Sequence, residues 1–452
     1  MTDRSAAAGD SLATPPSPRA RRAAWASVAG ATLEFYDFTV YGLAAALVFG
    51  KVFFPSVSPT VGLLSAFATF GVGFVMRPIG GAVFGHIGDR FGRKNALVAT
   101  LLMMGISTVL IGCLPSFATI GFWAPAVLVV LRLIQGLAYG GEWGGAVLIA
   151  SEHASPGRRS LYAALPNVGV SAGSLLGNLA FLLVGLLGTD AVQQWAWRLP
   201  FWSGAILVIV GIIVRLGVTE SPEFTHAVKQ SGRVRLPIIE SFRRYPLQIL
   251  MVAGAMGGLG SAAYINITYS VSFARGEGIA SWLPLTAILL SNLLQVILIP
   301  VFGVLADRYG VGKVFVLGAV AWAALTPFLF PALGTGSTIL IFLAYLIPYG
   351  IIGFNPPTAA SPSLFAESFD ARVRYSGLVG VQIGMCIAGF TPFVATLVNS
   401  AAGPVVVGLI TSAALLISAG CGAVLARMRR TVQAAEQVAP ASTPPLGTAG
   451  IG

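Results

Sequence analysis

The chain has 452 residues, of which 56% are hydrophobic and only 10% are charged, and its mean hydropathy is +0.84. Soluble domains carry roughly 25% charged residues, so this composition excludes a water-exposed globular protein and indicates that most of the surface faces lipid. The net charge of +11 would fit a nucleic-acid partner, but the basic residues punctuate apolar runs instead of gathering on one face, which argues against one.

Residues 1–22 form a Pro/Ala/Ser-rich arm that ends in a basic cluster. The apolar run after it is too long for a signal peptide and lacks a cleavage site, so we expect a retained first helix. A span needs about 20 mainly apolar residues, and twelve runs qualify. Their approximate bounds are Trp25–Phe49, Gly62–Ile87, Ala96–Leu114, Trp123–Ala150, Tyr162–Leu187, Trp197–Gly217, Pro246–Phe273, Leu283–Leu305, Val314–Pro331, Thr338–Phe365, Tyr375–Ser400 and Pro404–Ala426.

The loops between these spans differ strongly in charge. Nearly all of the 27 basic residues fall on the side of the N-terminus, whereas only Lys51, Arg198 and Arg275 fall on the other side. Positive charge is retained on the cytoplasmic side of membranes. We therefore expect a multi-pass protein of the cell membrane, inserted in the lipid bilayer with both termini in the cytoplasm.

One loop occurs twice, between the second and third spans and between the eighth and ninth. It reads GHIGDRFGRK at 85–94 and GVLADRYGVGK at 303–313. Paired halves are typical of transporters that rock two bundles around a central site. We predict an all-α fold with twelve transmembrane helices in two pseudo-symmetric six-helix bundles. The expected parts are a disordered arm 1–22, bundles 23–217 and 246–427, a cytoplasmic central loop 218–245 and a disordered tail 428–452.

The repeated loop supplies fixed charges and tight turns at the cytoplasmic mouth. It either serves only to set the topology or latches the two halves together, and the Asp between glycines in both copies favours a latch. The candidate latch residues are Gly85, Asp89, Arg90, Gly92, Arg93, Lys94, Asp307 and Arg308.

The first copy of the loop resembles the signature of the major facilitator superfamily, and the second departs from it at Val311-Gly312. Further segments resemble the metabolite:proton symporter branch, which includes carriers for shikimate, proline and betaine, α-ketoglutarate and citrate. These are EFYDF at 34–38, RPIGG at 77–81, RLIQG at 132–136, GGEWGG at 140–145, ESPEF at 220–224 and RVRYSG at 372–377. The resemblance runs from about Arg19 to Arg430 and implies that fold and proton-coupled uptake of a small metabolite; the opening third is most similar to shikimate carriers.

Three ionisable residues fall at the same depth of the predicted bilayer. Glu34 and Asp37 lie about 15 and 20 Å into the first span, and Arg132 of the fourth lies at a similar level. Positions i and i+3 share one helix face, and charges at this depth are usually functional. We expect Asp37 and Glu34 to carry a coupling proton and Arg132 to control its release or bind an anion. A permanently paired structural triad is the alternative.

Other polar positions give weaker indications. Glu142 is either a gate residue or a helix-end charge. Arg77, near the inner end of the second span, is expected to have a mainly structural role, because its side chain can extend toward the surface. Neutral polar side chains in spans either bind substrate or join helices. They are Tyr36, Tyr41, Gln135, Asn167, Asn266, Tyr269, Asn292, Gln295, Asn355 and Gln382.

We therefore expect a symporter whose partners are a proton and a small solute, with a carboxylate such as shikimate favoured, and a monomer without cofactor or metal. A drug/proton antiporter is the first alternative, but the Gly-Pro-x-x-Gly-Gly pattern common in the fifth span of such exporters is absent from Pro166–Gly173. A non-transporting sensor and an enzyme are remote alternatives, because the chain has only three histidines and no P-loop.

Overall fold

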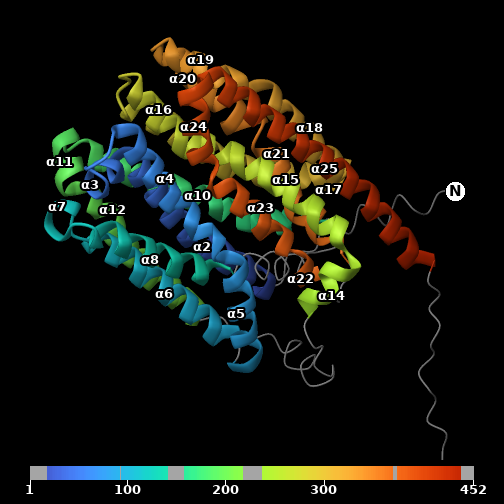
Figure 1. Cartoon of the computed structure of the whole chain (residues 1–452). Helices are drawn as coiled ribbons and strands as arrows, with labels where there is room; N and C mark the ends of the chain where they lie inside the picture. Colours follow the sequence, from blue (N-terminus) through green and yellow to red (C-terminus); the bar gives the residue numbers. More distant parts are fainter. Residues whose placement is uncertain (1–17, 92, 141–156, 217–236, 370–373, 439–452) are drawn as a thin grey trace, which may run out of the picture.

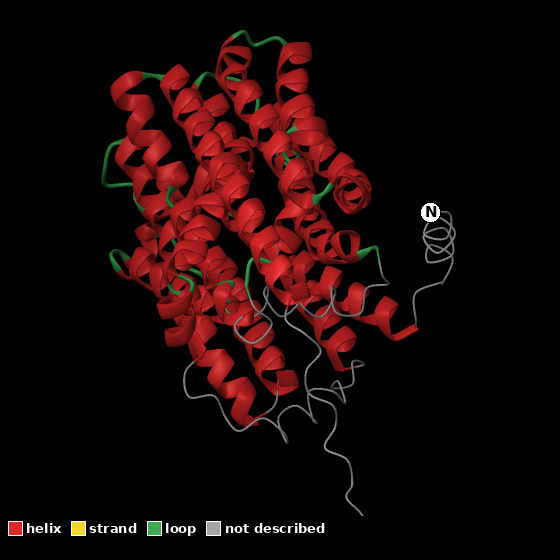
Figure 2. Cartoon of the chain, turned by 90° about the vertical axis from the view of Figure 1, so that its right-hand side faces the viewer, coloured by secondary structure: helices red, strands yellow, loops and turns green. Residues whose placement is uncertain are grey.

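The computed structural model describes residues 18–91, 93–140, 157–216, 237–369 and 374–438, and in these ranges the regular structure is helical throughout (Figures 1 and 2). Nine helical segments of the described chain are long and apolar enough to cross a membrane. Three shorter apolar helices cover 98–113, 123–139 and 196–211. Together they account for each of the twelve predicted spans, and the all-α membrane fold is confirmed.

The first half contains six spans. Its elements are α2 (Pro18–Ala44), η1 (Ala45–Phe49), α3 (Gly50–Phe53), α4 (Pro59–Val75), α5 (Arg77–Phe91), α6 (Arg93–Cys113), α7 (Phe117–Ile120), α8 (Trp123–Tyr139), α10 (Arg159–Gly185), α11 (Thr189–Gln194), η2 (Ala196–Arg198) and α12 (Leu199–Leu216).

The second half repeats the arrangement after the short helix α14 (Pro237–Arg244). Its elements are α15 (Pro246–Tyr264), η3 (Ile265–Tyr269), α16 (Ser270–Gly276), α17 (Trp282–Tyr309), α18 (Val311–Leu325), η4 (Thr326–Phe328), α19 (Leu329–Gly334), α20 (Thr338–Tyr345), η5 (Leu346–Ile352), α21 (Asn355–Ala366), α22 (Arg374–Gly377), α23 (Val379–Gly389), α24 (Thr391–Ala402) and α25 (Pro404–Val438).

The duplication extends to irregularities of the backbone. The first span of each half contains a π-helical turn, η1 in one and η3 in the other. A third π turn, η5, interrupts the tenth span around Pro348, and the helix restarts at Asn355 with Pro356 and Pro357 in its first turn. Such turns are frequent at functional sites, and this one lies where we expect the prolines to kink the span.

The helices extend past the expected boundaries of the terminal segments. Helix α2 begins at Pro18, inside the expected arm 1–22, and α25 continues to Val438, well past residue 427. The reason is local, because Arg and Ala make up residues 19–22, and Arg, Ala, Gln and Glu, which also favour helix, are frequent in 428–438, while Pro18 suits a first turn. The expected loop 218–245 likewise contains the amphipathic helix α14.

The two halves pack along their length. Helix α10 lies against α2 of its own half and against α17 of the other, and α4 lies against α23 and α24 (Figure 1). We call the end at which α2 begins and α25 ends the terminal side; α3, α7, α11, α16 and α19 lie at the opposite side (Figure 1). Within the first half, Gly136 of α8 contacts the carbonyl of Gly73 of α4, leaving no room for a side chain. This close approach places Arg132, the one charged residue of α8, directly against α4.

Candidate transport site

Asp37 lies at the centre of a buried hydrogen-bond network on α2. The residue is 2% exposed. Its Oδ2 accepts hydrogen bonds from Nε2 of Gln135 at 2.9 Å and from the hydroxyl of Tyr139 at 2.8 Å, and its Oδ1 accepts one from the hydroxyl of Thr108. Three helices, α2, α6 and α8, therefore meet on one carboxyl group. Such a network satisfies a charge that would otherwise be costly at this depth.

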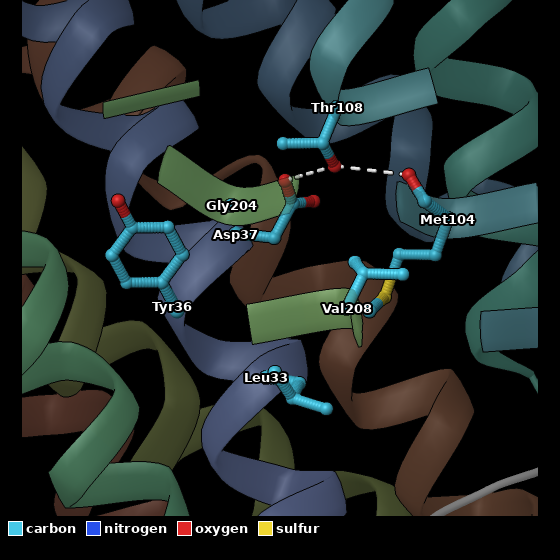
Figure 3. Close-up of a pocket in the computed structure, with 7 residues that line it drawn as sticks. All are labelled: Leu33, Tyr36, Asp37, Met104, Thr108, Gly204 and Val208. Atoms are coloured by element: carbon cyan, nitrogen blue, oxygen red, sulfur yellow. Dashed lines mark hydrogen bonds between the residues drawn. The ribbon is translucent and has the colours of Figure 1, made fainter. Parts of the chain in front are cut away.

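The Thr108 hydroxyl has two possible acceptors. It lies in reach of Asp37 and, 2.9 Å away, of the carbonyl of Met104 one turn earlier in α6 (Figure 3). A hydroxyl carries a single proton and accepts through its lone pairs. When Asp37 is ionised, Thr108 can donate to it; when Asp37 is protonated, it can donate to Thr108, which then donates to Met104. The network is thus satisfied in both protonation states.

Arg132 is fully buried and joined to Asp37 through one side chain. Its Nη1 donates to Oε1 of Gln135 at 3.2 Å, and its guanidinium stacks on the ring of Tyr41 at 4.1 Å. Among the described residues, nothing accepts a hydrogen bond from its Nε or Nη2. Arg132 lies so close to Gly73 of α4 that a Cβ there would fall 2.6 Å from Nε. A buried guanidinium with spare donors is costly unless another group completes it.

Arg77 does not reach the surface, as the sequence suggested it could. Arg77 is 3% exposed and pairs with Glu34 at 3.3 Å, and its guanidinium lies 4.3 Å from the ring centre of Phe38 and 4.6 Å from that of Phe74. It does not extend to the surface, because the second span continues as helix to Phe91 and leaves Arg77 deep in the bundle. Cation–π contact replaces the hydration that the guanidinium loses.

The expected group of three charges is therefore a group of four. The charged side chains that are buried among the described residues are Glu34, Asp37, Arg77 and Arg132. They form two units: the direct ion pair of Glu34 with Arg77, and the indirect connection of Asp37 to Arg132. With both carboxylates ionised, the four charges sum to zero.

A small hollow adjoins Asp37, and Arg132 is not among the residues that line it. It is lined by side chains of α2, α6 and α12 (Figure 3). The lining residues are Leu33, Tyr36, Asp37, Met104, Thr108, Gly204 and Val208. Its volume of about 10 Å³ approaches the minimum that holds one water molecule.

The comparisons with known proteins agree on one family. Residues 23–235 match the family described as "Sugar (and other) transporter". The chain is 42% identical to the shikimate transporter of Escherichia coli, over 83% of this chain and 87% of that protein, and 40% identical to the inner membrane metabolite transport protein YhjE of Escherichia coli, over 86% and 90%.

The chain belongs to the sugar (and other) transporters of the major facilitator superfamily. The fold agrees: a partially occluded, inward-open structure of the xylose transporter XylE from Escherichia coli superposes with a TM-score of 0.69 at 15% identity, covering 92% of this chain and 98% of that one. The predictions of the superfamily and of a multi-pass membrane transporter, not an enzyme, are confirmed.

In this transporter the candidate substrate residues fall into several groups. Tyr41 and Gln135 belong to the network around Arg132, whereas Tyr36 bonds Pro200 and Ser203 of α12. Asn167 and Gln295 connect the halves, through Thr358 at 2.7 Å and Ser171 at 3.0 Å. Most of the others contact their own half. These are Asn266, which donates to Ala262; Tyr269, whose ring packs against Phe273 and Phe330; Asn292, which accepts from Tyr349; and Asn355, which donates to Gly350 and Ile351.

The buried Oε1 of Gln382, on α23, has no partner among the described residues, and the same holds for Nδ2 of Asn292 and Oδ1 of Asn355. The Tyr264 hydroxyl of the second half is likewise buried without a partner there, and its ring packs 5.2 Å from Phe70 and 5.5 Å from Phe74 of the first half. Tyr264 was not among the sequence candidates, and nothing in its local pattern distinguishes it. Tyr139 could have been found, because it lies one and two turns after Gln135 and Arg132 on one face of α8.

At the terminal side, Asp307 joins the halves. Its carboxylate accepts hydrogen bonds from the backbone N–H groups of Ser160 at 2.8 Å and Leu161 at 3.1 Å, in the first turn of α10. A carboxylate is stabilised at a helix N-terminus, and this one comes from the other half. Arg308 lies beside Tyr309.

The rest of the proposed latch is not tested. Gly92 and the gate candidate Glu142 lie outside the described residues, as do the side chains at 85, 89, 90, 93 and 94.

Proposed function

We propose that this chain is a proton-coupled symporter that takes up a small organic carboxylate. The observation that supports it most is the buried guanidinium of Arg132, whose Nε and Nη2 have no acceptor among the described residues. A carboxylate accepts two hydrogen bonds from an arginine in fixed geometry. An anionic solute would satisfy both free donors at once.

The charges of the site favour an anion that travels with a proton. Glu34, Asp37, Arg77 and Arg132 sum to zero when both carboxylates are ionised. Protonating Asp37 leaves one positive charge in excess, and a monocarboxylate restores neutrality. Because an unpaired charge in this interior is costly, proton and anion each make the binding of the other more favourable. Reciprocal coupling of this kind is what symport requires.

Gln135 connects the two binding events. Its amide oxygen accepts from Arg132 and its amide nitrogen donates to Asp37. When a solute carboxylate draws the guanidinium away, the amide is free to turn, and the hydrogen bonds that stabilise ionised Asp37 weaken. The carboxyl group then retains its proton more readily while the solute is bound.

Neutral polar groups of the second half suit hydroxyl groups of the solute. The Tyr264 hydroxyl, Oε1 of Gln382 and Nδ2 of Asn292 are all buried without a partner among the described residues. Three such polar groups, together with an arginine, fit a hydroxylated carboxylate better than a purely apolar acid. Shikimate belongs to this class and is the solute named for a relative at 42% identity.

Uptake into proteoliposomes with an acidic exterior tests the proposal. The panel should contain shikimate, dicarboxylates, citrate, proline and betaine. We expect a hydroxylated monocarboxylate to accumulate when the exterior is acidic, and clamping the membrane potential at zero should leave its initial rate unchanged because proton and anion move together. Accumulation of betaine alone, or loss of preloaded solute in exchange for protons, would contradict the proposal and favour zwitterion uptake or antiport.

A further inference from the structure

The hollow beside Asp37 offers a route to the carboxyl group that does not pass between the halves. Its lining comes from α2, α6 and α12 of the first half alone. The other side of Asp37 is covered by Gln135 and Tyr139. The carboxyl group of Asp37 can therefore be approached from two sides, through the hollow or past Gln135 and Tyr139. Only the side of Gln135 and Tyr139 adjoins Arg132 and the proposed solute site.

The lining points from Asp37 toward the terminal side. Asp37, Thr108 and Gly204 lie at one level, and Leu33, Met104 and Val208 lie one turn closer to the terminal side on the same three helices (Figure 3). The Thr108 hydroxyl connects the two levels, because it lies within hydrogen-bond distance of both Asp37 and the Met104 carbonyl. The hollow thus has a polar end at the carboxyl group and an apolar end below it.

An apolar contact closes the lower end. Leu33 and Leu101 both lie against Gly211 of α12, and Val208 lies against Gly105 of α6. Gly211 has no side chain to hold these leucines apart. A small movement of α12 relative to α2 and α6 would open this contact and admit a short file of water.

We propose that this hollow is a water site through which Asp37 exchanges its coupling proton with the solution on the terminal side; this rests on the proposed function. Protonated Asp37 transfers a proton to the water in the hollow, giving carboxylate and hydronium, and the hydronium passes its proton to solvent when the Leu33–Leu101 contact opens. The Thr108 hydroxyl then turns from Met104 to Asp37 and stabilises the carboxylate. The solute leaves separately, between the halves.

Filling the hollow tests the route. A Cβ at Gly204 would lie 3.3 Å from the Thr108 methyl and 3.7 Å from the Tyr36 ring, so Gly204→Ala requires a slight shift of that methyl, whereas Gly204→Val is designed to fill the water position. The matched control is Gly420→Val, at an exposed glycine of α25, the sixth span of the second half, with nothing around it. Two rates are compared in proteoliposomes: uptake driven by a pH gradient, and solute exchange at equal pH, which needs no net proton movement.

We expect Gly204→Val to slow gradient-driven uptake about tenfold relative to Gly420→Val, as overfilling of a packed site does. The exchange rate of Gly204→Val should stay within about twofold of the control. The gradient-driven uptake rate of Gly204→Ala should lie between those of the control and Gly204→Val. Leu33→Ala should speed gradient-driven uptake. Equal gradient-driven rates in Gly204→Val and its control would overturn the route, and so would parallel loss of exchange in Gly204→Val and Gly204→Ala. Absence of proton movement in the unmodified protein would instead overturn the proposed function itself.

Discussion

Asp37 and Arg132, on helices α2 and α8, share a single intermediary: Gln135 accepts from the guanidinium at 3.2 Å and donates to the carboxylate at 2.9 Å. Opposite charges at this depth would ordinarily pair directly. Here the amide keeps two guanidinium N–H groups without an acceptor among the described residues. The indirect connection leaves the arginine able to bind an anion without first breaking an ion pair.

Removing the intermediary should separate proton movement from solute movement. Gln135→Leu keeps the size of the side chain but removes both hydrogen bonds, each worth about 1.5–3 kcal/mol because it involves a charged group. We expect solute exchange to persist and the number of protons moved per solute to fall well below the value of the unmodified protein. The control is Gln194→Leu on the exposed helix α11. An unchanged proton-to-solute ratio in Gln135→Leu would contradict the role of the amide.

Arg132→Lys tests the anion site. Lysine keeps the charge but loses the planar pair of donors that matches a carboxylate. We expect the KM for the carboxylate to rise about tenfold, the equivalent of roughly 1.4 kcal/mol, with a smaller change in the maximal rate. Initial uptake rates over a range of solute concentrations give both constants. If the KM of Arg132→Lys stays within twofold of the value for the unmodified protein, Nε and Nη2 of Arg132 do not bind the solute.

The pair of Glu34 and Arg77 should govern stability more than affinity. Glu34→Gln or Arg77→Gln alone leaves a buried charge without its partner, and we expect each to destabilise the protein by about 3–5 kcal/mol. The double variant removes both charges and should recover most of the loss. Thermal unfolding in detergent measures this. Additive losses in the double variant would indicate that the two side chains act independently.

Closure at the two sides of the molecule rests on different contacts. Asp307 binds the first turn of α10 at the terminal side, and Arg275 donates to the carbonyl of Leu47 within the π turn η1 at the opposite side. Each contact joins one half to the other. We expect Asp307→Ala to favour opening at the terminal side and Arg275→Gln to favour opening at the opposite side.

Distances between spin labels in a cysteine-free background would measure these shifts. Labels at the exposed positions Arg159 and Tyr309 report the terminal side, and labels at Lys51 and Thr335 report the opposite side. Asp307→Ala should lengthen the distance at the terminal side and leave the distance at the opposite side unchanged or shorter. Arg275→Gln should have the reverse effect on the two distances. Identical distance distributions in all three proteins would mean that neither contact holds a gate.

The architecture could be predicted because its determinants are local. Apolar length identifies the spans, and loop charge and the repeated Asp-Arg loop identify the two halves. Most of the charged residues of the site could be predicted as well, because charged residues at bilayer depth are rare. Tyr139 could have joined it through its spacing from Arg132 and Gln135.

The partners within the site depend on helix packing and could not be predicted. Depth in a helix does not say that Glu34 faces Arg77 and not Arg132, because that choice depends on how α5 and α8 rotate against α2. The hydroxyl of Thr108 and the hollow near Gly204 are likewise products of three helices that meet. No single segment of sequence contains that information.

Solute-driven proton uptake is the most direct test of the account. With proteoliposomes in weakly buffered medium at equal pH, addition of the transported carboxylate should make the exterior alkaline in the unmodified protein. In Asp37→Asn this alkalinisation should be absent while solute exchange continues, because asparagine keeps the polar contacts but cannot exchange a proton. Alkalinisation of normal size per solute in Asp37→Asn would contradict the claim that Asp37 carries the coupling proton.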